Sequence, residues 1–123
     1  MKLRFRKNSL RLRVNQREVE SLAAGEALEE QVYFPGDACI SYVLETVLTG
    51  PPRASFRQGV IRVSAPRKEI QNWAQGDAIG LYFDLPANGA ALKVAVEKDL
   101  ECVDGPPEER DPDAFPRGTG KNC

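Results

Sequence analysis

A ten-residue stretch near the start of the chain returns fifty-one residues later. Residues 5–14 read FRKNSLRLRV and residues 56–65 read FRQGVIRVSA. At this offset seven positions are identical, from Phe5 with Phe56 to Ala27 with Ala78, and several positions between them are conservatively replaced. Because the match runs through a helical stripe, a stop glycine and a following acid, it predicts a duplicated structural unit.

The order of the hydrophobic patterns predicts the elements of that unit. Alternation with period two is typical of half-buried strands, and a capping box of Asn15 and Glu18 predicts a helix that Gly25 ends. In the second unit Pro66 stands at the favoured first position of a helix that Gly76 ends. The predicted strands are 2–6, 9–14, 28–34, 39–48, 54–57, 60–64, 78–85 and 91–97.

These elements predict an α+β fold made of a duplicated strand-strand-helix-strand-strand unit. About eight mostly antiparallel strands and two short helices would form one sheet system or a closed barrel with pseudo-twofold symmetry. The predicted domain covers residues 1–98, with halves 1–49 and 54–98. Residues 99–123 hold seven acids and many prolines and glycines, so we expect an acidic tail that is disordered or loosely docked.

The chain contains no histidine, which limits the chemistry it can perform. Nucleophiles assisted by a histidine base are excluded, and so are zinc sites that need histidine. Cys39, Cys102 and Cys123 form no CxxC pair, so we expect reduced thiols in a cytosolic protein, with a Cys102–Cys123 disulfide as the alternative. No apolar run suits a membrane span. We expect no cofactor, no membrane partner, and a binding module rather than an enzyme.

Charge is polarised along the chain although the formal net charge is only −1. The first seventeen residues carry seven Lys or Arg and no acid. Pairing of the first two strands would place four arginines on one face, and a fifth arginine lies at the repeated position. The candidate anion-binding residues are therefore Arg4, Arg6, Arg11, Arg13 and Arg62. Guanidinium groups suit phosphate oxygens because they donate paired hydrogen bonds.

The same arginines fit other roles, and the sequence leaves these alternatives open. A solvated basic face keeps an edge strand from aggregating, and the acidic tail of the chain could also pair with it. An anionic ligand, a nucleic acid and a protein are all compatible partners.

Carboxylates form a second candidate site. Glu45 and Glu97 fall at nearly equivalent positions in the two halves, and hard cations such as Mg²⁺ need converging oxygen ligands. The sequence shows no convergence, so no metal site is assigned. Glu18 and Glu69 are interpreted as helix caps, and Trp73 as a core residue rather than a platform for stacked bases.

Three long segments together resemble a family of small bacterial proteins of unknown function. They read NSLRLRVNQREVESL, FRQGVIRVSAPRKEIQNWAQGD and VEKDLECVDGPPEERDPDAFP. The resemblance covers essentially the whole chain. It implies no activity, so no catalytic residue is carried over from it.

Two better-known folds are similar in part. The stretch KNSLRLRVNQREVESL is similar to the N-terminal part of swapped-hairpin antitoxins and transition-state regulators, and this similarity implies DNA binding. The two-halved plan is similar to the triphosphate-tunnel fold, an eight-stranded barrel, which implies phosphate binding and metal-dependent hydrolysis. The first strand of that fold carries alternating glutamates, whereas this chain has Lys2, Arg4 and Arg6 there. A likeness of fold alone does not assign a function.

Overall fold

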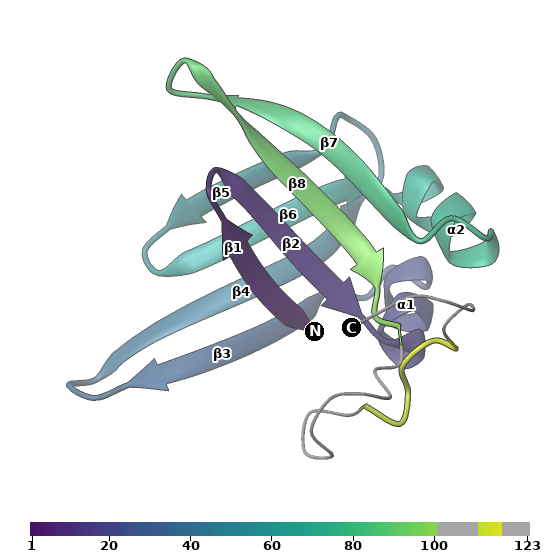
Figure 1. The fold of residues 1–123 in the computed structure, drawn as a ribbon, viewed down its shortest axis with the longest axis horizontal. Helices are drawn as coiled ribbons and strands as arrows, with labels where there is room; N and C mark the ends of the chain where they lie inside the picture. The colour runs from purple at the N-terminus through teal and green to yellow at the C-terminus, as the bar shows by residue number, and fades with distance from the viewer. Residues whose placement is uncertain (101–110, 117–123) are drawn as a thin grey trace.

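The computed structural model describes residues 1–100 and 111–116, and Figure 1 shows its ribbon. Its elements are β1 (Lys2–Arg6), β2 (Ser9–Val14), α1 (Gln16–Ala23), β3 (Leu28–Phe34), β4 (Ala38–Val47), β5 (Arg53–Arg57), β6 (Val60–Pro66), α2 (Arg67–Gln75), β7 (Gly80–Ala87) and β8 (Ala90–Lys98). The predicted α+β class and the predicted order of elements are confirmed. Strand ends differ from the prediction by one or two residues, as is usual where strands fray into turns.

The eight strands form two four-stranded sheets, and the closed barrel that we considered is not formed. Sheet A has the order β1-β2-β8-β7, and sheet B has the order β3-β4-β6-β5. Every hairpin is antiparallel, whereas the central pairs β2–β8 and β4–β6 are parallel. Each sheet therefore joins one hairpin from each half of the chain, so the two halves exchange hairpins.

The register across the central pairs confirms that the halves are equivalent. Arg13 lies opposite Glu97 in sheet A, and Ser64 lies opposite Glu45 in sheet B. Arg13 and Ser64 are the residues that the repeat aligns in sequence. Glu45 and Glu97 therefore occupy the same place in the two sheets.

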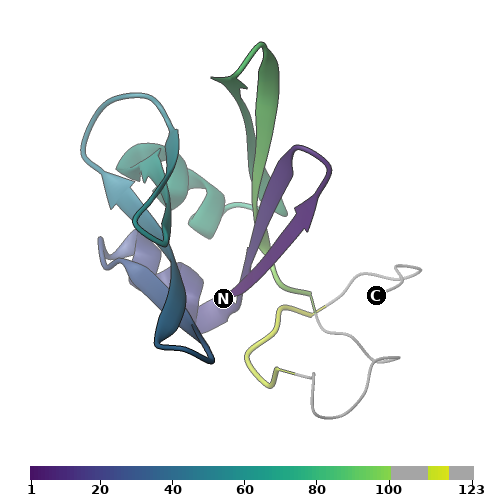
Figure 2. The same cartoon turned by 90° about the vertical axis from the view of Figure 1, so that its left-hand side faces the viewer.

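Both helices lie at one end of the molecule and the four hairpin turns at the other (Figure 1). Viewed toward the turns, the sheets appear as two layers with the helices behind them (Figure 2). Leu10 and Leu12 of β2 are buried and alternate with the partly exposed Arg11 and Arg13. The inner face of each sheet is thus apolar. The largest fully buried side chains are Leu12, Val14, Leu22, Leu44, Val63, Ile70, Val94 and Val96.

Local sequence signals set the ends of the helices. The Asn15 side chain accepts a hydrogen bond from the Glu18 N–H at 2.9 Å, and the Glu18 carboxylate accepts one from the Asn15 N–H at 3.0 Å. This is the predicted capping box. Gly25 follows α1 with φ of 92°, a conformation that favours glycine.

The second helix differs from the prediction at its start. Pro66 is the residue before the helix rather than its first member, and it makes no side-chain capping bond. Its backbone stays extended because it still belongs to β6. Gly76 ends α2 as predicted, and its N–H donates to the Asn72 carbonyl at 3.0 Å.

A short acidic segment, residues 111–116, lies against the start of α1. The Gln16 N–H donates to the Asp113 carbonyl at 2.9 Å, and the Asn15 side-chain amide donates to the Asp111 carboxylate at 2.9 Å. The bond from Asn15, helped by a bond from the Asp113 N–H, lowers the pKa of Asp111 from its usual value. The segment thus supplies acceptors for donors at the helix start.

The rest of the predicted tail, residues 101–110 and 117–123, lies outside the described residues. The two alternatives for Cys102 and Cys123 fall there as well. Within the described part of the chain, no helix has the length and apolar character needed to cross a bilayer.

Candidate functional site

The outer face of the β1–β2 hairpin gathers five cationic side chains. In the antiparallel register Lys2 lies opposite Arg13, and Arg4 lies opposite Arg11. Directly opposed residues point to the same side of a sheet, so these residues share the face that turns away from the core. The basic face consists of Lys2, Arg4, Arg6, Arg11 and Arg13.

Two of the cross-strand pairs on the basic face join like charges. Opposed Cβ atoms in an antiparallel pair lie about 4.5–5.5 Å apart, and like charges at that separation destabilise the sheet. Lys2–Arg13 and Arg4–Arg11 are such pairs. The hairpin therefore brings positive charges together in a way that favours negatively charged groups beside it.

One carboxylate on the same face partly neutralises this charge. A Glu97 oxygen lies 3.1 Å from Arg11 Nε and 3.7 Å from Arg13 Nε. The hydroxyl of Tyr82 donates to the other Glu97 oxygen at 2.6 Å. The pKa of Tyr82 is raised, mainly because of this hydrogen bond and secondly because the hydroxyl is partly buried. Glu97 thus acts as a counterion that holds two of the arginines.

The other three cations of the basic face differ in their partners. Lys2 Nζ lies 2.8 Å from the Asp99 carboxylate. Arg4 and Arg6 are exposed and form no ion pair with any residue in 1–100 or 111–116. Lys93 of β8 lies opposite Ser9 and extends the positive charge beyond the hairpin. Free guanidinium groups at the turn end of the hairpin are available to an external anion.

Arg62 does not join the other four arginines. It lies on β6, on the outer face of sheet B, where its guanidinium pairs with Glu45. Ser64 Oγ donates to the same carboxylate at 3.1 Å. The core separates this face from the basic face, so the five predicted arginines do not surround one cavity.

Glu45 and Glu97 likewise lie on different sheets, each beside an arginine. Among the described residues, no three His, Cys, Asp or Glu side chains are grouped so that they could hold a metal ion. Each glutamate is therefore the ion-pair partner of an arginine.

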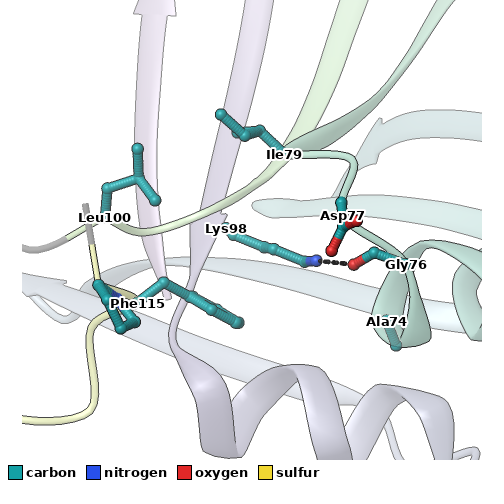
Figure 3. Close-up of a pocket in the computed structure, with 8 residues that line it drawn as sticks. Ala74, Gly76, Asp77, Ile79, Lys98, Leu100 and Phe115 are labelled. Carbon is teal, nitrogen blue, oxygen red and sulfur yellow. Dashed lines mark hydrogen bonds between the residues drawn. The ribbon is translucent and has the colours of Figure 1, made fainter. Parts of the chain in front are cut away.

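A separate pocket of about 380 Å³ lies between the end of α2, the end of β8 and segment 111–116 (Figure 3). Its lysine is already engaged, because Lys98 Nζ donates to the Gly76 carbonyl at 2.9 Å. The same Nζ lies 5.9 Å from the centre of the Trp73 ring and 5.5 Å from that of Phe115. Phe115 lines this pocket, and among the described residues the only lysine that lines it is already held by a carbonyl and two aromatic rings.

Sequence reasoning left Lys2 out of the anion-binding set and considered Glu97 only as a weak metal candidate. Lys2 continues the alternation of Arg4 and Arg6, so the pattern itself could have included it. Glu97 became visible as the counterion only through the parallel pairing of β2 with β8. That pairing joins residues more than eighty positions apart in sequence, beyond the reach of a local pattern.

Fold and site together define a duplicated α+β protein with exchanged hairpins and one basic sheet face. The model of a family of unknown function, DUF7009, matches residues 1–119, so the chain belongs to this family. The predicted resemblance to a family of proteins of unknown function is confirmed. Searches of curated proteins and of solved structures found no significant match.

Proposed function

We propose that this protein is a non-enzymatic binding module that holds an extended polyanion on its basic face. The observation that supports the proposal is the presence of two pairs of opposed like charges in the β1–β2 hairpin. Such pairs cost stability, and an anionic partner that screens them would offset the cost. The proposal keeps the cytosolic location predicted from the sequence, where the exposed Cys39 thiol would stay reduced.

The shape of the site favours an extended partner over a single small anion. The three cations of β1 alternate over four residue steps, which span roughly 13 Å at about 3.3 Å per residue. Duplex DNA carries one negative charge about every 1.7 Å of its axis, so a row of this length would meet several phosphates. An enclosed phosphate site has less support, because Arg62 and Glu45 lie on the other sheet.

Duplex DNA is therefore the probe for a first binding experiment. Binding of a short labelled duplex is measured by fluorescence anisotropy over a series of salt concentrations. The test variant is Arg4→Ser/Arg13→Ser, because Ser55 and Ser64 stand at the equivalent positions of the second hairpin. We expect weaker binding and a slope of log K against log salt that is smaller by roughly 2.

The matched control is Arg53→Ser/Arg57→Ser, which removes two charges from the outer face of sheet B. It changes the net charge equally but leaves the basic face intact. We expect it to bind nearly as tightly as the natural chain. Equal losses in both variants would show a net-charge effect, and no binding at low salt would reject the polyanion. Binding of inorganic triphosphate without duplex binding would point to a small anion instead.

A further inference from the structure

The four edge strands of the two sheets differ in how they resist unwanted pairing. Edge strands expose unpaired N–H and C=O groups, and proteins usually protect them with charged side chains, proline or bulges. β1 carries three cations and β5 carries Arg53 and Arg57. β7 contains Pro86 and the exposed Asp84. Three of the four edges thus carry charged residues or a proline.

The second half of β3 has no such protection. This strand pairs only with β4 among the described strands, and its sequence ends in Gln31, Val32, Tyr33 and Phe34. The three apolar side chains are 43%, 75% and 55% exposed, respectively. Glutamates occur only in the first half of the strand. An unprotected apolar edge is a template for another strand.

We infer that a second copy of this chain binds there, with the two β3 strands antiparallel across a twofold axis. The charge pattern of β3 favours its own copy as the occupant. In a register centred on Val32, that residue faces Val32 of the second copy, and Glu30 faces Phe34. The glutamates of the two copies then lie at opposite ends of the pair, so like charges never meet.

The pairing has consequences for the rest of the molecule. Sheet B becomes one continuous eight-stranded sheet across the two copies, and the interface is self-complementary as twofold symmetry requires. Val32 and Phe34 share the inner face of sheet B with Leu28 and Glu30, so this register brings the two Val32 side chains together and places each Glu30 beside Phe34 of the other copy. The basic face belongs to sheet A and remains uncovered, so the dimer is independent of polyanion binding.

The oligomeric state of the full chain tests this inference. Sedimentation velocity, from micromolar to several hundred micromolar chain, is expected to show a species of twice the 13.6 kDa chain mass. Val32→Lys places a charge on the inner face of the edge and is expected to leave only monomer. Its far-ultraviolet circular dichroism should match that of the natural chain, because the side chain is partly exposed.

The matched control is Phe56→Lys. Phe56 is 67% exposed and also lies on the inner face of an edge strand, β5. This variant should remain dimeric. A natural chain that is monomeric throughout, a dimeric Val32→Lys, or equal dissociation of both variants would overturn the inference.

Cross-linking tests the register in a background of Cys39→Ser, Cys102→Ser and Cys123→Ser. Val32→Cys should form a disulfide-linked dimer on mild oxidation, because directly opposed residues lie within disulfide reach. Tyr33→Cys should not, since its copies lie diagonally at about 7–8 Å. Failure of the Val32→Cys variant to cross-link would contradict the pairing.

Discussion

The hairpins β1–β2 and β5–β6 have the same fold but different outer faces. Their turns start alike, with φ of 51° at Lys7 and 50° at Gln58. Their inner positions stay apolar, as Leu12 and Val63 show. On the outer face, however, Arg4 and Arg13 of the first hairpin correspond to Ser55 and Ser64 of the second. Because both hairpins fold, the extra charges of the first are not required by the architecture.

Mutations on the apolar inner face are expected to lower stability the most. The loss should occur in both hairpins. Leu12 and Val63 are completely buried at equivalent positions. We expect Leu12→Ala to lower the free energy of unfolding by about 2–5 kcal/mol. Val63→Ala removes two carbons and should cost about 2 kcal/mol, at roughly 0.8 kcal/mol per buried group plus a cavity contribution. Urea denaturation measures both. A loss below about 1 kcal/mol at either site would show that the two hairpins are not equally buried.

The second-largest effect on stability is expected in the turn of the second hairpin. Gly59 has φ of 77°, and a Cβ there would lie 3.0 Å from the Cys39 carbonyl oxygen. Gly59→Ala is therefore expected to destabilise the fold by about 1–2 kcal/mol, measured by urea denaturation. Asn8 is the equivalent residue of the first turn, where its side-chain amide donates to the Ala91 carbonyl at 2.8 Å. A neutral Gly59→Ala would mean that the second turn relaxes away from β4.

Removing a charge from the basic face is expected to change stability less, and to raise it. Arg4→Ser removes one opposed like-charge pair, so we expect a gain of about 0.2–1 kcal/mol in the free energy of unfolding at low salt. The gain should shrink as salt screens the charges. The reciprocal Ser55→Arg, opposite Arg62, is expected to destabilise the second hairpin. If Arg4→Ser instead lowered stability, the like charges would not destabilise the hairpin, and this argument for a binding role would be wrong.

The smallest expected effect is that of low pH on the docking of segment 111–116. The pKa of Asp111 is lowered in the folded chain, so its contribution is present above the usual aspartate pKa and is lost as pH falls through the lowered value. We expect the amide resonances of Gln16 and Asp113 to shift as the segment loosens in acid. Asp111→Asn should weaken the docking at neutral pH and remove this titration. An unchanged titration in that variant would assign it to another group.

The candidate site was predictable only in part. The alternation of arginines in residues 2–14 follows from strand geometry, so the shared face of Arg4, Arg6, Arg11 and Arg13 was available from the sequence. Arg62 was grouped with them because repetition in sequence was taken as proximity in space. In a duplicated fold, equivalent residues are related by symmetry and can lie on opposite faces, as Arg11 and Arg62 do here.

The sequence by itself determined the elements and the equivalence of the two halves. Alternating hydrophobicity, the Asn15–Glu18 capping box and the stop at Gly25 are local signals, and each acts over a few residues. Only the tertiary structure decided that the halves exchange hairpins, that two sheets form instead of a barrel, and that Glu97 neutralises two arginines. These contacts join residues far apart in the chain, and their register depends on how the shared core packs, which no local pattern encodes.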